Sequence, residues 1–132
     1  MGSDEQKRLA VTFLENFNTA DPEVFASLVT DNFRFEIISS LKEFPPILGG
    51  PEFAIKEAET LKRLFPEGLK LILETVVSED SHVIVLAKAD TIAMNGRRYA
   101  QRYAFYLRFE GNRIAEGREY NDTNLVREVF LG

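Results

Sequence analysis

The chain has 132 residues, 45% of them hydrophobic, which is enough for one compact domain with a substantial core. Its formal net charge of −5 argues against a nucleic-acid-binding protein, which would show a basic surface. It contains no cysteine, so disulfides, thiolate nucleophiles and cysteine metal sites are excluded. No apolar signal segment and no run of membrane-spanning length is found, so we expect a cytoplasmic protein with a single domain over residues 1–132.

Two amphipathic helices are predicted at the start of the chain. Ser3 followed by Gln6 is a capping-box pattern, and the apolar residues after it recur at helical spacing until about Thr19. A second, short helix is expected after Asp21-Pro22, because an acidic cap followed by proline favours a helix start. Its apolar residues are Val24, Phe25, Leu28 and Val29.

A strand, a loop and a third helix are predicted next. Residues 32–38 alternate between apolar and polar side chains, which predicts a strand with Phe35 on one face and Glu36 on the other. Residues 39–50 are rich in proline and glycine and predict a long loop that can act as a lid. A helix is expected over 51–65, because proline begins it and its apolar residues have helical spacing. Those residues are Ala54, Ala58, Leu61 and Phe65.

From Leu69 onwards the apolar residues recur at every second position, which indicates a meander of four strands. The strands are expected at about 69–77, 82–94, 97–110 and 113–121, with the turn sequences SEDS, NG and GN between them. A short helical tail follows. The predicted order is therefore helix, helix, strand, helix and four strands, an α+β domain in which a curved sheet wraps over helices.

The Asn95-Gly96 pair predicts a two-residue turn that places Met94 opposite Arg97. If Gly111-Asn112 is also a two-residue turn, polar side chains form two rows on the bulky face of the sheet, above the phenylalanines. The rows are Asp90–Gln101–Asp122 and Lys88–Tyr103–Tyr120. This layout suits a cavity that is polar on one side and apolar on the other. A shift of one residue at the second turn would replace Asp122 and Tyr120 with Asn121 and Glu119.

Three segments, DNFRFEI, LGGPEFAIKE and FEGNRIAEGREYNDT, resemble the nuclear-transport-factor-like superfamily, in particular SnoaL-like and ketosteroid-isomerase-like proteins. The resemblance covers nearly the whole chain. It implies a cone-shaped, strongly curved mixed sheet wrapped around helices, the cystatin-like or SnoaL-like α+β fold, in the order α-α-β-α-β-β-β-β. It also implies a hydrophobic cavity and a homodimer that forms through the outer face of the sheet.

The resemblance also implies catalytic positions. SnoaL-like cyclases use an aspartate at the end of the final strand as a base, and Asp122 occupies that place. Ketosteroid isomerases use an acid on the strand after the second helix, where Glu36 is the nearest match. Their tyrosine on the first helix has no counterpart, since Phe13 and Phe17 occupy that stripe. The Asp-Arg-Asp arrangement of limonene-epoxide hydrolases is also incomplete, because no aspartate lies two positions after Arg102.

The candidate acids have structural alternatives. Asp122 is equally suited to capping the final helix. Asp90 and Lys88 are either an acid/base pair or anchor for a polar substrate group, or they form a solvated strand end. Ile92 and Met94 lie further out on the same predicted face, which favours the cavity.

The remaining candidates also have two interpretations. Tyr103 and Tyr120 either donate hydrogen bonds to a substrate oxygen or serve as bulky walls. Glu36 is an acid or an ordinary surface charge. His82 follows a turn and is expected at the surface, so neither a histidine-dependent triad nor a zinc site is predicted.

We therefore predict a cofactor-independent isomerase, cyclase or lyase that acts on a mostly apolar, carbonyl-containing molecule, with Asp122 or Asp90 as the base. The residues expected to bind substrate are Lys88, Gln101, Tyr103, Tyr120, Phe105 and Phe35. One alternative is a noncatalytic ligand-binding protein. The other is an association module with a closed cavity, which dimerises through a flat outer face made of Ala87, Ala89, Ala100 and Ala104.

Overall fold

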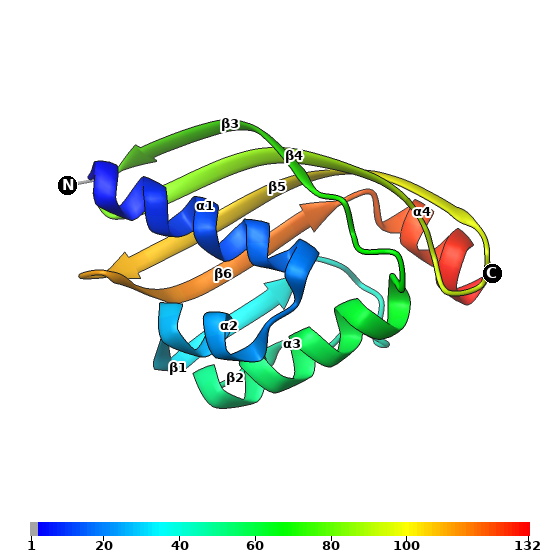
Figure 1. The fold of residues 1–132 in the computed structure, drawn as a ribbon, viewed down its shortest axis with the longest axis horizontal. Helices are drawn as coiled ribbons and strands as arrows, with labels where there is room; N and C mark the ends of the chain where they lie inside the picture. Colours follow the sequence, from blue (N-terminus) through cyan, green and yellow to red (C-terminus); the bar gives the residue numbers. More distant parts are fainter. Residues whose placement is uncertain (1–2) are drawn as a thin grey trace.

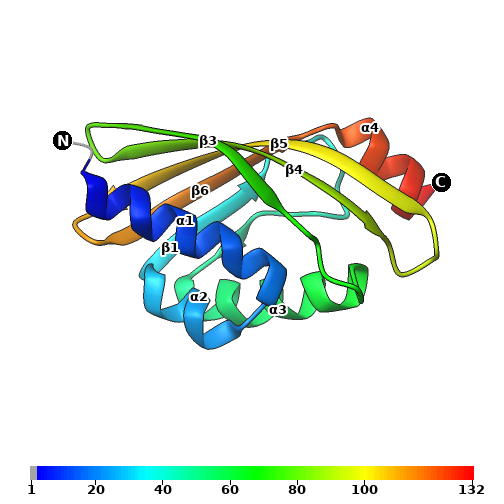
Figure 2. The ribbon, with the colours of Figure 1, turned by 45° about the horizontal axis from the view of Figure 1, so that its top comes forward.

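The computed structural model describes residues 3–132 and confirms the predicted α+β class, with one strongly curved sheet and helices packed inside the curve (Figures 1 and 2). The sheet has six strands in the order β2-β1-β6-β5-β4-β3. It is mixed, because β1 runs parallel to β6 and the other pairs are antiparallel. None of the helices formed by residues 3–132 is long and apolar enough to cross a lipid bilayer.

The two N-terminal helices begin at the predicted caps. Helix α1 spans Asp4–Thr19, and the Ser3 side chain accepts a hydrogen bond of 3.0 Å from the backbone N–H of Gln6. Helix α2 spans Pro22–Leu28 and is capped by Asp21. Val29, predicted at the end of this helix, is instead the first residue of strand β1, Val29–Ile37.

The middle of the chain crosses the open side of the sheet. The predicted loop contains a short strand, β2 (Ile47–Leu48), which pairs with β1. Helix α3 then spans Gly50–Leu64. A Cβ atom at Gly50 would lie 2.3 Å from the carbonyl oxygen of Thr30, so only glycine fits where α3 approaches the backbone of β1.

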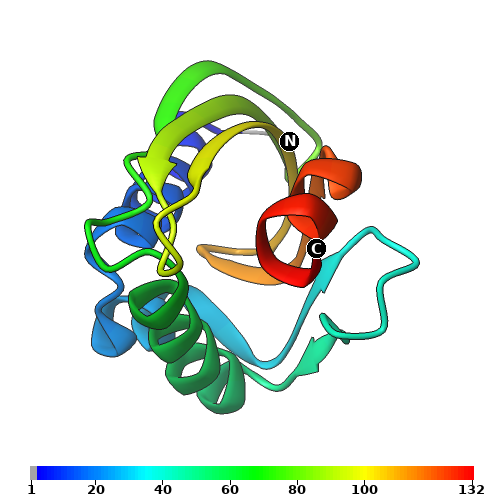
Figure 3. The ribbon, with the colours of Figure 1, turned by 90° about the vertical axis from the view of Figure 1, so that its right-hand side faces the viewer.

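The four C-terminal strands form the curved wall seen in Figure 3. They are β3 (Ile72–Glu79), β4 (His82–Ile92), β5 (Arg98–Glu110) and β6 (Arg113–Asn121). The chain ends in a short helix, α4 (Thr123–Val126), that continues as the π-helical turn η1 (Arg127–Leu131). This C-terminal segment lies at the same end of the molecule as the last turn of α3 (Figure 1).

Phenylalanines from α1, α2, β1 and α3 fill the interior. Each is at most 2% exposed, and their rings meet mostly edge to face, for example at 4.8 Å between the centroids of Phe33 and Phe53. The cluster consists of Phe13, Phe17, Phe25, Phe33, Phe35 and Phe53. Burying each such side chain contributes about 1.5–3 kcal/mol, so this cluster is a main source of stability.

The predicted register between β4 and β5 is wrong by one residue. The loop has three residues, Met94 to Gly96, closed by a bond of 2.8 Å from the Ala93 N–H to the Arg97 carbonyl, with Gly96 at φ 83°. A three-residue loop with glycine in the left-handed region is the other common hairpin for this sequence. Asp90 therefore pairs with Ala100, not with Gln101.

This shift turns the side chains of β4 to the other face of the sheet. Lys88, Asp90 and Ile92 point outward, while Ala87 and Ala89 are buried on the concave face. The prediction that Ala87 and Ala89 belong to a flat outer face is therefore wrong. Small residues on the concave side leave room beside the longer side chains of β5.

The second hairpin has the predicted two-residue turn, but a β-bulge follows it. Phe109 pairs with Ile114 as expected, and then Arg108 pairs with Glu116, so Ala115 is an extra residue in β6. Beyond the bulge Phe105 lies opposite Glu119 and Tyr103 opposite Asn121. The concave face thus carries Glu119 and Asn121, the alternative pair to Tyr120 and Asp122.

Candidate functional site

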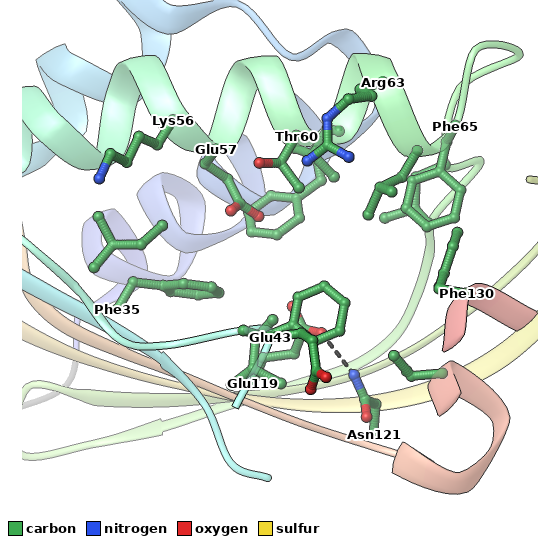
Figure 4. Close-up of a pocket in the computed structure, with 18 of the residues that line it drawn as sticks. Phe35, Glu43, Lys56, Glu57, Thr60, Arg63, Phe65, Glu119, Asn121 and Phe130 are labelled. Carbon is green, nitrogen blue, oxygen red and sulfur yellow. Dashed lines mark hydrogen bonds between the residues drawn. The ribbon is translucent and has the colours of Figure 1, made fainter. Parts of the chain in front are cut away.

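A cavity of about 300 Å³ opens between α3, the concave face of β5 and β6, the loop before β2 and the C-terminal helix (Figure 4). Its walls are mostly apolar and include Phe17. Phe35 lies at the inner end, and Phe65 and Phe130 lie at the outer end (Figure 4). Polar side chains also line it: four glutamates, two tyrosines, one lysine, one arginine, one threonine and one asparagine, of which Glu57 and Glu119 are buried. This combination of apolar walls and a few convergent polar groups is typical of a small-molecule site.

Glu57 and Glu119 face each other across the cavity from opposite walls (Figure 4). Glu57 projects from α3 and Glu119 from β6, and each side chain belongs to a residue that is only 7% exposed. Burial, with a smaller contribution from nearby Glu119, raises the pKa of Glu57 from 4.5 to about 8. Burial also raises the pKa of Glu119, to about 7.

Asn121 makes the two acids unequal. Its Nδ2 donates a hydrogen bond of 2.8 Å to Oε2 of Glu119, which favours the ionised form and lowers the pKa of that carboxyl relative to what burial alone would give. Glu57 receives no hydrogen bond from residues 3–132. Near neutral pH the pair therefore holds one proton, mainly on Glu57, and Glu119 is the carboxylate.

The orientation of the Asn121 amide lowers the stability of the folded protein. Its Oδ1 is buried and finds no hydrogen-bond partner among residues 3–132. Leaving such an acceptor unpaired costs about 1–3 kcal/mol. The amide is fixed by its hydrogen bond to Glu119. A buried acceptor left unpaired lowers stability, so this orientation of Asn121 calls for a reason other than stability.

Two tyrosines on β5 form a hydrogen-bonded pair beside the acids. The hydroxyls of Tyr99 and Tyr103 are 3.0 Å apart, and Nε2 of Gln101 donates to the Tyr99 hydroxyl at 3.3 Å. Burial raises the pKa of both tyrosines, so both stay protonated. If Tyr99 accepts from Gln101 and donates to Tyr103, the Tyr103 proton is free for a ligand oxygen.

Of the residues predicted to bind substrate, Tyr103 and Phe35 line the cavity. Phe105 is fully buried beneath Tyr103, with ring centroids 5.1 Å apart, and does not line it. Gln101 lies behind the tyrosines, where its amide bonds to the backbone N–H and carbonyl of Asp122, both at 3.0 Å. It fixes the junction between β6 and α4.

The other predicted site residues lie outside the cavity. Asp90 is exposed and receives two hydrogen bonds from Arg98, at 2.7 and 3.0 Å, which lower its pKa. Lys88 is 3.6 Å from Glu74 on the outer face. The placement of Asp90 and Lys88 inside the pocket was wrong, because it depended on the two-residue turn.

The remaining predicted acids have structural roles. Asp122 is exposed and caps α4, accepting hydrogen bonds from the backbone of Asn124 and Leu125, which is the alternative recognised in the sequence. Glu36 is paired with Arg34 at 3.1 Å. Tyr120 points outward and is 41% exposed. The bulge in β6 explains why Tyr120 and Asp122 do not line the cavity, because it moves both residues off the concave face.

The sequence offered one signal for the missed acid on α3. Glu57 lies three residues after Ala54 and four before Leu61, so a charged side chain interrupts the apolar stripe of the helix. Within residues 3–132 no three histidine, aspartate or glutamate side chains gather as they would around a metal ion. The side chains that line the cavity carry carboxyl, hydroxyl, amide, ammonium and guanidinium groups.

Solved structures with the same fold come from several bacteria. One from Bacillus subtilis, named a candidate isomerase, is 22% identical, with 98% of this chain and 94% of that chain covered and a TM-score of 0.84. An epoxide hydrolase of the limonene-epoxide-hydrolase-like type from M. tuberculosis is 18% identical, with 96% and 90% covered and a TM-score of 0.78. A candidate SnoaL-like polyketide cyclase from Jannaschia sp. CCS1 is 19% identical, with 98% and 95% covered and a TM-score of 0.76.

These identities are low enough that the likeness concerns the fold alone. No curated protein is similar enough in sequence to count as a match. The family model of the SnoaL-like domain, however, matches residues 10–117, from the middle of α1 to the glycine beyond the bulge in β6. The chain therefore belongs to the SnoaL-like domain family.

Proposed function

We propose that this protein is a cofactor-independent isomerase, cyclase or lyase that moves a proton next to a carbonyl group of a mostly apolar molecule. The observation that carries the proposal is the pair of buried carboxyl groups, Glu57 and Glu119, facing one cavity with different proton affinities. Solved structures of the same fold are named a candidate isomerase, an epoxide hydrolase and a candidate polyketide cyclase, which agrees with such a reaction class.

Each polar group has a role in this mechanism. The Glu119 carboxylate removes the proton from the carbon beside the carbonyl. The Tyr103 hydroxyl and the protonated Glu57 carboxyl donate hydrogen bonds to the carbonyl oxygen as it gains negative charge. Glu57 or the protonated Glu119 then returns a proton to the product. Asn121 holds the base in position, and Tyr99 orients the Tyr103 hydroxyl.

We expect the wild-type protein to exchange the α-protons of 2-tetralone for deuterium in D₂O, as measured by proton NMR. The rate should rise as Glu119 ionises, around pH 7, and fall as Glu57 loses its proton, around pH 8, giving a narrow bell-shaped profile. Saturable binding without exchange would instead identify a noncatalytic binding protein. A profile that climbs steadily to pH 10 would contradict the assignment of Glu57 as a proton donor.

We also propose that two copies associate through the convex face of the sheet. Six large apolar residues on this face are at least 36% exposed: Ile72, Val77, Ile84, Leu86, Ile92 and Tyr120. Exposed apolar surface of this kind on neighbouring strands is typical of an interface. Leu86→Glu is expected to convert the dimer to a monomer in analytical ultracentrifugation, whereas Lys62→Glu, an exposed change on α3 away from this face, should leave the sedimentation coefficient nearly unchanged.

A further inference from the structure

The cavity contains buried negative charge that no basic side chain neutralises. Both carboxyl groups belong to residues that are 93% buried. The pKa of Glu57 responds to burial and to Glu119, and that of Glu119 to burial and to Asn121, but neither responds to a lysine or arginine. The titratable and charged groups around Glu57 are Lys56, Glu59 and Arg63 on α3, Glu43 in the loop before β2, Tyr99 and Tyr103 on β5, and Glu119 on β6. With Glu57 itself, four carboxyl groups and two basic side chains line the cavity.

The two basic residues lie at the rim and do not compensate the acids. Lys56 is exposed, and its Nζ lies 2.8 Å from the Glu52 carboxylate. Arg63 is also exposed, and neither it nor Lys56 is among the groups that shift the pKa of Glu57 or Glu119. A ligand can therefore supply the positive charge that the lining residues do not bring to these two carboxyl groups.

Glu57 is the acid best placed to meet such a ligand. Its carboxyl group points into the cavity in Figure 4 and has no hydrogen-bond partner among residues 3–132, whereas Glu119 is already bonded to Asn121. A buried carboxyl without a partner stays protonated, but a positive charge within about 4–6 Å favours its ionised form. A charge-assisted hydrogen bond to an ammonium group would satisfy it.

The aromatic walls suit the rest of a cationic ligand. Phe65, Tyr99 and Phe130 lie together at the outer end, with ring centroids 5.0–5.7 Å apart, and Phe35 lies near Glu57 at the inner end. Ring faces attract cations and also accept alkyl groups, so a protonated amine and its carbon skeleton both find favourable surfaces.

We propose that the cavity is also a binding site for apolar amines, with the ammonium group paired to the Glu57 carboxylate and the carbon skeleton against the aromatic walls. This binding activity goes beyond the proton-transfer reaction and does not require turnover. An amine in this position occupies the space of the carbonyl substrate, so it also acts as a competitive inhibitor of that reaction.

Binding of an amine is coupled to release of a proton. At neutral pH Glu57 is protonated and an alkylamine, with a pKa of about 10.4, is charged. The complex holds both groups in the charged form, so the Glu57 proton leaves as the amine binds. The affinity should therefore rise about tenfold per pH unit below pH 8 and level off above it.

The test is isothermal titration calorimetry with cyclohexylmethylamine and its neutral isostere cyclohexylmethanol at pH 6, 7 and 8, in two buffers of different ionisation enthalpy. The amine is expected to bind at least tenfold more tightly than the alcohol at pH 8. Its binding should release close to one proton at pH 6. Glu57→Gln should abolish the pH dependence of amine binding and the preference for the amine, while its affinity for the alcohol stays close to that of the wild type. Glu59→Gln, the same change at the rim, should leave the pH dependence, the preference and the alcohol affinity unchanged.

Equal affinities for the two compounds in the wild type, or a pH dependence that survives in Glu57→Gln, would overturn the proposal. The absence of any binding would do the same. The two proposals can be rejected independently. Deuterium exchange on 2-tetralone without amine binding would support the proposed enzyme and reject the amine site. Amine binding without exchange would reject the proposed enzymatic activity and support a binding protein.

Discussion

Replacing Glu119 with glutamine is expected to lower the rate of α-proton exchange by about 10²–10⁴-fold, the contribution of a positioned general base. The amide has nearly the same shape and can still bond to Asn121, but it cannot accept the substrate proton. Binding of the ketone should change little, because the apolar walls remain. The measurement is the exchange rate of 2-tetralone in D₂O at pH 7.5, with the ketone affinity measured in parallel.

Glu57→Gln should have a different signature from Glu119→Gln. It removes the proton donor but not the base, so the rate should fall while the acidic limb of the pH profile, around pH 7, is retained. The alkaline limb should disappear, because glutamine does not ionise. This separates an acid from a residue that only shapes the cavity, for which both limbs would persist.

Matched carboxyl-to-amide changes at Asp90 and Asp122 serve as controls. Asp90 is paired with Arg98 on the outer face, and Asp122 caps α4, a position that asparagine fills equally well. Both variants are expected to exchange 2-tetralone at the wild-type rate. A large loss in Asp122→Asn, together with full activity in Glu119→Gln, would move the base to the end of β6 and reject the site described above.

The helices and strands could be predicted from the sequence because their signals are local. Ser3 and Asp21 cap helices as expected, and the change of period after Leu69 marks the meander. The family resemblance supplied the arrangement of these elements. A helix cap or a repeat of apolar residues depends on a few neighbouring residues, so it can be recognised without knowing how the rest of the chain folds.

The site could not be predicted because it depends on register, which is set by single residues. One extra residue in the Asn95-Gly96 loop reverses every side chain of β4, and one extra residue at Ala115 reverses the end of β6. Turn sequences are compatible with more than one loop length, and a bulge has no strict sequence signature. The register thus explains why Asp90 left the cavity and why Glu119 took the place of Asp122. Glu57 was missed for another reason: on α3 it has the sequence signature of an ordinary helix charge.

Glu57→Gln is also expected to stabilise the protein at alkaline pH. In the folded protein the pKa of Glu57 is raised to about 8, from 4.5 for an exposed glutamate. Between these values the folded state keeps a proton that the unfolded chain has released, so the stability of the wild type falls as pH rises from 4.5 to 8. The shift corresponds to a loss of a few kcal/mol, at most about 5, and Glu119 adds a smaller loss of the same sign.

The variant should therefore unfold at higher urea concentration than the wild type at pH 8.5, by about 1–3 kcal/mol in free energy, and should be nearly equal to it at pH 4.5. Glu52→Gln, an exposed change on the same helix, should leave the pH dependence unaltered. A protein that gains stability when an acid is removed has kept that acid for another reason, and a carboxyl facing a ligand cavity supplies one. If the two pH dependences coincide, Glu57 is solvated rather than buried, and the acid pair loses its physical basis.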